Sequence, residues 1–293
     1  MKAFETYHPI VLFTYFVSVI GLSIFFMHPI YLAFTLIISC LLNVILHKSK
    51  LKSSLWFYIP LFFVTAVANP FFSHNGEIVL FYVNYNPITL EAILYGLAMA
   101  SMILAVILWF ACYNSVMTSD KFIYLFGKIS PSLSLIISLS LRLVPKFKKQ
   151  LYIISNAQRS VGMDYTSGNI IQRMKSVIQI ISILITWALE NSIETADSMK
   201  ARGYGLKHRT AFSLFIFTKR DGFILALTLS LLLINILGSI MGYTTYNYYP
   251  TFSEINGSFV SMVLYSSYAL LLLIPIIIEV REAMIWRLLK SKI

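Results

Sequence analysis

The chain has 293 residues, of which 58% are hydrophobic and only 12% are charged. Soluble domains have roughly half apolar and about a quarter charged residues, so this composition excludes an ordinary soluble fold and predicts an all-α integral membrane protein. The net charge of +11 does not indicate a nucleic-acid partner, because the basic residues follow a membrane topology and form no groove-reading motif. Cys40 and Cys112 lie in separate apolar segments and predict neither a disulfide framework nor a thiolate metal site.

Six apolar segments approach the length that a membrane span requires. A hydrocarbon core about 30 Å thick needs roughly 20 helical residues. The segments lie near residues 10–26, 30–46, 55–72, 91–112, 222–240 and 259–278. Only "MHPI" joins the first two, which predicts a helical hairpin there.

The positions of the basic residues predict how these spans are oriented. Fifteen of the 23 Lys and Arg residues fall between Lys121 and Arg220, and seven more lie at 48–52 or beyond residue 280. The loops at 73–89 and 241–258 contain none. Because cytoplasmic loops carry the excess of basic residues, we expect a multi-pass membrane protein with both termini in the cytoplasm and these two loops outside.

We therefore divide the chain into N-terminal spans (1–112), a basic cytoplasmic region (113–220), and C-terminal spans with a tail (221–293). The middle region still contains two apolar runs, "LSLIISLSL" and "VIQIISILITWAL". Both are short for crossing a bilayer and suit helices that are buried against other helices. A rival topology makes each run a span, but it would place two basic clusters on opposite sides of the membrane.

One long amphipathic helix is predicted from Ile170 to Arg202, about 50 Å long at 1.5 Å per residue. Opposite a polar stripe runs an apolar one, formed by Ile171, Met174, Ile178, Ile181, Ile185, Ala188, Ala196 and Met199. The preceding segment, "RLVPKFKKQLYIISNAQRSVG", predicts a second helix that starts at Pro145, and "GMDYTSGN" predicts the turn between them. We expect the two helices to cross on the cytoplasmic side.

Both helices end in a short cluster of arginine and glycine, "AQRSVG" at 157–162 and "KARGYG" at 200–205. Glycine is the usual stop after a last helical turn, and a cation there is favoured by about 0.3–1 kcal/mol by the helix dipole, so each end is also explained as an ordinary cap. A guanidinium, however, also holds a carboxylate of another protein bidentately, and small neighbours permit close approach. Each end is therefore a candidate docking point.

This layout resembles the T component of energy-coupling factor (ECF) transporters for vitamins and metal ions. The resemblance rests on four stretches: "MKARGYG", "AQRSVG", "SLRLVPKF" at 140–147 and "NPFF" at 69–72. It implies about six transmembrane helices plus two or three long cytoplasmic coupling helices. It also implies that the chain joins two ABC-type ATPase subunits to one membrane-embedded substrate-binding subunit, the S component, within the lipid bilayer.

The same resemblance implies the sites. One ATPase would bind Ala201, Arg202 and Gly203, with Arg202 as the anchor, and the other would bind the first helix end, formed by Arg159, Ser160, Val161 and Gly162. That first end departs from the family pattern, because Val161 stands where an arginine is expected. Either Arg159 replaces it or the contact is apolar. We expect the S component to contact Ile178, Ile181, Ile185 and Met199.

We expect no catalytic residue, no metal site and no cofactor in this chain, since the partner ATPases would bind the ATP. The stretch "FGKIS" at 126–130 fails as a phosphate loop, because Phe122 stands where the first glycine belongs and Ile129 follows Lys128. The five histidines are dispersed, and no predicted span carries an ionisable residue at mid-depth. Two alternatives are a conventional ABC importer permease, which forms the translocation path itself, and an uncharacterised membrane enzyme.

Overall fold

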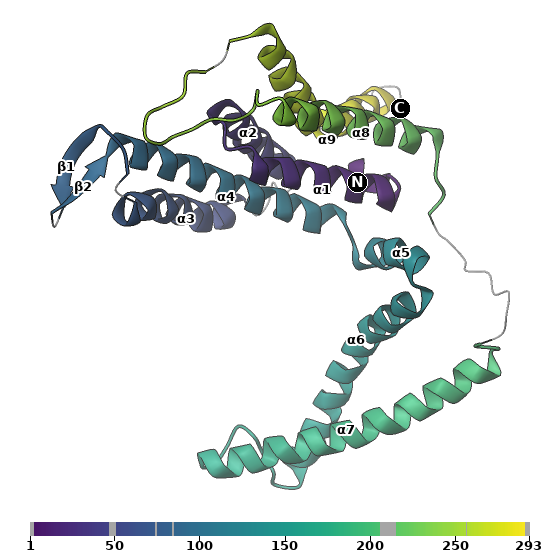
Figure 1. The fold of residues 1–293 in the computed structure, drawn as a ribbon. Helices are drawn as coiled ribbons and strands as arrows, with labels where there is room; N and C mark the ends of the chain where they lie inside the picture. Colours follow the sequence, from purple (N-terminus) through teal and green to yellow (C-terminus); the bar gives the residue numbers. More distant parts are fainter. Residues whose placement is uncertain are drawn as a thin grey trace. The chain divides into compact units, whose positions relative to one another are not determined.

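The computed structural model describes residues 3–46, 51–73, 75–83, 85–205, 215–255 and 257–290. The Cα positions divide the chain into two compact units, residues 1–122 with 215–293 and residues 123–214. The chain leaves the first unit within helix α5 (Ser119–Ile129) and returns to it shortly before helix α8 (Lys219–Ile240). Helices dominate the described residues, which confirms the all-α membrane fold (Figure 1).

The first unit is a bundle of six long helices, preceded by a single 3-10 turn. The turn η1 is Phe4–Thr6, and the helices are α1 (Pro9–Phe25), α2 (Pro29–Leu46), α3 (Leu51–Phe72), α4 (Leu90–Val116), α8 and α9 (Phe259–Lys290). Helix α4 packs against α1, α2 and α3, and α9 packs against α2 and α8 (Figure 1). The predicted spans thus correspond to helices, although α9 runs 12 residues beyond the predicted end at residue 278.

The expected turn between α1 and α2 follows from a repeated tripeptide, His-Pro-Ile. His8 and His28 precede the two helices, and the Nδ1 atom of each ring accepts a 3.3 Å hydrogen bond from the backbone N–H two residues later. Proline then occupies the first helical position, where no N–H donor is needed. Each tripeptide therefore starts a helix.

Close packing in this unit depends on aromatic rings and on small residues. Trp109 of α4 lies edge-on to Tyr15 and Phe16 of α1, and all three side chains are buried. A Cβ atom on Gly96 of α4 would lie 2.4 Å from a backbone oxygen of α3, and one on Gly238 of α8 would lie 2.5 Å from a leucine side chain of α9. Glycine at these positions lets the helices approach closely, as in many membrane bundles.

Five described helices are long and apolar enough to cross a membrane by length and composition, namely α2, α4, α7 (Ile170–Ala201), α8 and α9. Helix α1 and residues 56–72 of α3 are apolar but shorter. Helix α7 has a window of mean hydropathy 1.5, whereas the other four have values from 2.1 to 2.4. The apolar run "VIQIISILITWAL" is short for a span by itself, but α7, which contains it, has the length and composition of one, although α7 is the least apolar of the five.

A short hairpin between α3 and α4 was not expected. Strands β1 (Val79–Val83) and β2 (Asn86–Thr89) pair antiparallel within the loop at 73–89, with an irregularity between Val79 and Phe81. The N–H of Ile78 donates to the buried carboxylate of Glu91 in the first turn of α4 at 3.2 Å, which attaches the base of the hairpin to that helix.

The second unit contains helix α6 (Pro131–Ser160) and α7, joined by residues 161–169. The prediction that the first of these helices starts at Pro145 is wrong. Pro131 at the first helical position starts α6, and Pro145 lies in its interior. Proline there lacks one N–H donor, but its ring is on the exposed side and the helix continues.

Helices α6 and α7 pack on each other along one face only. The ring centroids of Phe147 and Trp187 lie 5.7 Å apart at an interplanar angle of 73°, and the Lys146 ammonium lies 5.5 Å from the Trp187 ring centre. Lys146 also donates to the side-chain oxygen of Asn191. The apolar runs of both helices were expected to be buried, but most of their side chains are exposed, because a single contact face covers only part of each helix.

Candidate functional site

The C-terminal end of α6 closes in a glycine turn in which two backbone hydrogen bonds are nested. The N–H of Gly162 donates to the carbonyl of Arg159 at 3.1 Å, and the N–H of Met163 donates to the carbonyl of Gln158 at 2.9 Å. Gly162 has φ +87°, a left-handed conformation that glycine adopts without strain. This pattern is a Schellman motif with Val161 as its C-cap residue.

The end of α7 has the same turn. Gly203 has φ +77°, and its N–H donates to the carbonyl of Lys200 at 2.9 Å. The N–H of Tyr204 donates to the carbonyl of Met199 at 3.0 Å, and Arg202 is the C-cap residue. The two helix ends that the sequence singled out are therefore closed by one backbone geometry.

This geometry equates positions between the two ends. Val161 corresponds to Arg202, because both are C-cap residues directly before the left-handed glycine. Arg159 corresponds to Lys200, two residues before the cap. The side chain of Val161 is 76% exposed, so the first end presents an apolar group where the second presents a guanidinium.

The turn alone does not mark a docking site. Helix α8 ends in the same way, with Gly242 donating to Ser239 at 3.0 Å and Tyr243 donating to Gly238 at 3.1 Å. What distinguishes the ends of α6 and α7 is the exposed cation within the last turn. Ala201 and Ser160, the last residues of the two helices, are exposed as well, and Gly203 is half-buried.

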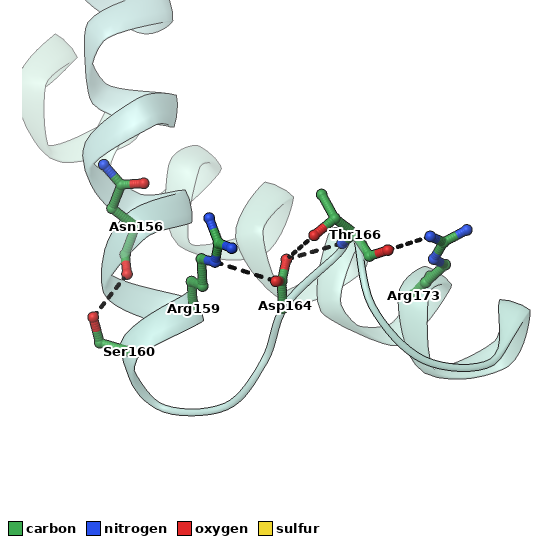
Figure 2. A network of polar contacts seen from close by, with 6 residues as sticks. All are labelled: Asn156, Arg159, Ser160, Asp164, Thr166 and Arg173. Carbon is green, nitrogen blue, oxygen red and sulfur yellow. Dashed lines mark hydrogen bonds and ion pairs between the residues drawn. The ribbon is translucent and has the colours of Figure 1, made fainter.

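Arg159 is engaged within the chain. Its Nε atom lies 3.2 Å from a carboxylate oxygen of Asp164, with side-chain exposures of 68% and 15% for the two partners. Asp164 also accepts hydrogen bonds from the backbone N–H of Thr166 at 2.9 Å and from its hydroxyl at 2.7 Å, and Arg173 donates to the carbonyl of Thr166 (Figure 2). The hydrogen bonds from the Thr166 backbone and hydroxyl, together with the nearby arginines, lower the pKa of Asp164.

Arg202 is exposed, and among the described residues its guanidinium makes no ion pair or hydrogen bond. The neighbouring Lys200 forms an exposed pair with Asp197 at 3.7 Å. Of the two candidate anchors, Arg202 is thus exposed without an ion pair or hydrogen bond among the described residues, whereas Arg159 shares its charge with Asp164.

The residues predicted to contact the S component lie along α7. Ile178, Ile181 and Ile185 are exposed, whereas Met199 is half-buried. An open groove of about 600 Å³ adjoins this face and is lined by Ile171, Met174, Lys175, Ile178, Gln179, Ser182 and Ile183. Leu189 and Ile193, which the sequence interpretation left out, are exposed too and continue the row of Ile181 and Ile185 at steps of four residues.

Across the part of the chain that the structure describes, no group of three or more His, Cys, Asp or Glu side chains could hold a metal ion. The arrangement at the two helix ends offers charge, hydrogen-bond donors and apolar contact rather than a reactive group.

Comparison with known proteins gives consistent results. The family described as cobalt transport protein, CbiQ, matches residues 6–212. An energy-coupling factor transporter transmembrane protein EcfT of Streptococcus thermophilus is 38% identical over 112 residues, which are 38% of this chain and 40% of the relative. The EcfT of Lacticaseibacillus paracasei is 38% identical over 107 residues, which are 35% of this chain and 40% of the relative. The EcfT of Bacillus subtilis is 34% identical over 90 residues, which are 30% of this chain and 34% of the relative.

These alignments span only about two fifths of the relatives' length, whereas the family match covers most of the chain and includes both helix ends. The resemblance to the T components of energy-coupling factor transporters is thereby confirmed, and the chain belongs to the CbiQ family.

Proposed function

We propose that this multi-pass membrane protein is the scaffold and energy-coupling subunit of an ECF-type ABC importer. It would link two ATPase subunits to a separate substrate-binding membrane subunit that takes up a vitamin or a metal ion. The ATP would be bound and hydrolysed by the ATPases, and this chain would carry no catalytic site of its own. It would lie in the bacterial cytoplasmic membrane with both termini in the cytoplasm.

The observation that carries this proposal is the pair of equivalent helix ends. Two helices of 30 and 32 residues pack on each other and end in the same glycine-closed turn, with exposed arginine in or beside each turn. A pair of ATPases presents two equivalent grooves, so two equivalent ends are what such a pair requires. When the two ATPase subunits close on ATP, helices that are held by them at their ends would transmit this closing movement as rigid levers.

The exposed apolar face of α7 supports the second half of the proposal. Ile178, Ile181 and Ile185 are exposed, whereas α6 contacts α7 through the ring pair of Phe147 and Trp187. A membrane-embedded partner would bury this face, and each fully buried isoleucine is worth about 1.5–3 kcal/mol. Substrate specificity would then reside in that partner.

A conventional ABC permease is the second candidate. Such a subunit touches its ATPase through one short loop helix, so it has no need of two packed helices of this length. The geometry therefore favours the scaffold.

Copurification from membranes tests the proposal. The wild-type chain should retain ABC-type ATPases that mass spectrometry identifies, and Arg202→Glu should lose them while the protein still inserts into the membrane. Lys148→Glu is a matched control, because Lys148 is also exposed and the charge changes equally, but it lies mid-helix in α6. Undiminished retention of ATPases by Arg202→Glu would refute the anchor role.

A further inference from the structure

The chain leaves the first unit, called the membrane unit below, just after Lys121 and has returned to it by Asp221. Both of these side chains bond to the same short N-terminal segment. That segment, residues 4–8, is called the N-terminal clasp below. All of the contacts involved lie within the first unit. Neither side chain has a role in the proposed docking of ATPases.

On the departing side, Lys121 is 6% exposed although it is a lysine. Its ammonium donates to the carbonyl of Glu5 in the clasp at 2.6 Å and to the carbonyl of Val116 at 2.9 Å. Val116 is the last residue of α4, so one ammonium joins the end of that helix to the clasp. Burial lowers the pKa of Lys121, which shows that this placement disfavours the charge.

On the returning side, Asp221 is 4% exposed in the first turn of α8. One carboxylate oxygen accepts from the backbone N–H of His8 at 2.9 Å, and the other accepts from the backbone N–H and hydroxyl of Thr218 at 2.8 and 2.5 Å. The ring of His8 also meets that of Phe217 edge-on, with centroids 5.2 Å apart. Two independent contacts thus hold the returning chain to His8.

The clasp itself is anchored in the bundle. The ring of Phe4 is 2% exposed and packs edge-on against Tyr15 at 5.4 Å and Phe16 at 6.1 Å, both in α1. The backbone N–H of Phe4 donates to the carboxylate of Glu279 in α9 at 3.1 Å. The clasp therefore touches α1, α9 and the start of α8, and Lys121 joins it to the end of α4.

Simple helix capping does not account for this arrangement. An exposed lysine or arginine would satisfy the last carbonyls of α4 equally well and without a desolvation cost. Among the described residues the hydrogen-bond acceptors of Lys121 are instead two backbone carbonyls, and burying a cation without a direct ion pair is unfavourable. The bonds of Lys121 and Asp221 to the clasp instead fix the place where the chain leaves the first unit relative to the place where it returns.

We infer that Lys121 and Asp221 are positioning residues for energy coupling, and that the N-terminal clasp holds the two ends of the segment 123–214 at a fixed separation. This inference rests on the proposed function. Movement imposed on that segment by ATPases enters the membrane unit at residues 121 and 221, and a fixed separation delivers it to α4 and α8 together. Without the clasp, the connections at residues 121 and 221 would move independently of each other. ATP hydrolysis would then not be coupled to a joint movement of α4 and α8.

The test uses the complete complex in nanodiscs, with Cys40 and Cys112 replaced and spin labels placed at exposed Asn114 in α4 and Ser230 in α8. MgATP with vanadate should shift the distance between the labels in the otherwise wild-type complex. Lys121→Met and Asp221→Asn should lose this shift while they retain the ATPases and their hydrolysis. Lys121→Arg, which keeps the donors, should preserve it.

Two controls separate coupling from stability. Thr218→Ala removes the capping hydroxyl of α8 but leaves the bond between Asp221 and His8, and Lys219→Met removes an exposed positive charge nearby. Both should keep the shift. A full shift of the label distance in Lys121→Met and Asp221→Asn, or no shift in the parent complex, would overturn this inference alone. A parent complex that contains no ATPases would overturn the proposed function and this inference with it.

Discussion

Val161 and Arg202 are C-cap residues of the same glycine-closed turn, one at the end of α6 and one at the end of α7. The backbone at the two ends is therefore equivalent, and the difference lies in the side chains. An exposed apolar group stands at one end and a guanidinium at the other. If each end binds one ATPase, the two contacts differ in strength and in salt dependence.

Arg202→Ala should weaken binding of the ATPases at least tenfold, about 1.4 kcal/mol, because it removes a guanidinium that has no described partner within the chain. Arg159→Ala should cost less than about 1 kcal/mol, the range of exposed ion pairs, since Arg159 already shares its charge with Asp164. Titration of the purified ATPases against each variant measures both values. An equal or larger loss in Arg159→Ala would reverse the ranking.

Gly162→Ala should destabilise the end of α6 by roughly 1–2 kcal/mol, the cost of a left-handed conformation for a residue with a Cβ atom. The φ of Gly162 is +87°, and an added Cβ would meet nothing within 4 Å, so strain is the whole effect. Hydrogen exchange at Val161 and Met163 measures it. Gly21→Ala is the control, because that site in α1 has equal free space, and alanine there should be neutral or stabilising. Unchanged exchange in Gly162→Ala would contradict this account.

The sequence predicted the element types well where a pattern repeated over many residues. Helix α7 was expected from Ile170 to Arg202 and runs from Ile170 to Ala201, since its period and its flanking turn residues agree. Asn169 and Gln172 form a capping box at its start, a signature within four residues of sequence. Glycine directly after a helical pattern likewise predicted the matching turns at Gly162 and Gly203.

Features that depend on contacts distant in the chain were not predictable. Pro145 predicts a helix start because proline usually marks a boundary, whereas in the structure Pro131 starts the helix, which continues past Pro145. The ion pair of Arg159 with Asp164 depends on the path of the loop, and the bonds of Lys121 and Asp221 to the N-terminal segment join residues more than 100 positions apart. No local pattern contains that information.

Trp187→Ala should loosen the crossing of α6 and α7. It removes the edge-on contact with Phe147, worth about 0.5–1.5 kcal/mol beyond burial, and the cation–π contact with Lys146, worth about 0.5–1 kcal/mol at an exposed site. Hydrogen exchange in the middle of α6 should rise roughly tenfold, which corresponds to about 1.4 kcal/mol. Trp187→Phe should retain most of the protection, and Leu189→Ala, at an exposed position, should retain all of it. Equal exchange in Trp187→Ala and Leu189→Ala would show that this crossing does not depend on the ring pair.

The loop between α6 and α7 should lose order in acid but be insensitive to pH near neutrality. The hydrogen bonds from Thr166 and the nearby arginines lower the pKa of Asp164 in the folded chain. The resulting stabilisation is fully present above the unfolded value of about 3.9 and disappears as the pH falls through the lower folded value. Protection of the Thr166 amide, followed from pH 7 to pH 2.5, reports this loss.

Asp164→Asn should show the loosened loop already at neutral pH, because the amide forms weaker hydrogen bonds and no ion pair with Arg159. Asp197→Asn removes the same charge from an exposed pair on α7 and should leave the Thr166 amide unaffected. A loss of protection between pH 5 and pH 7 in the wild-type chain would show that another group controls the loop.

The exposed apolar face of α7 should be required for the substrate-binding subunit and not for the ATPases. Ile185→Glu places a charge among Ile178, Ile181 and Leu189, all of which are exposed and would be buried by that partner. Loss of one buried isoleucine and burial of a carboxylate together should reduce retention of the partner at least tenfold. Thr186→Glu is the matched control, because it introduces the same charge one residue away on the polar stripe. Both variants should retain the ATPases through Arg202, so equal loss of the substrate-binding subunit in the two variants would show that charge on α7, rather than this apolar face, governs its binding.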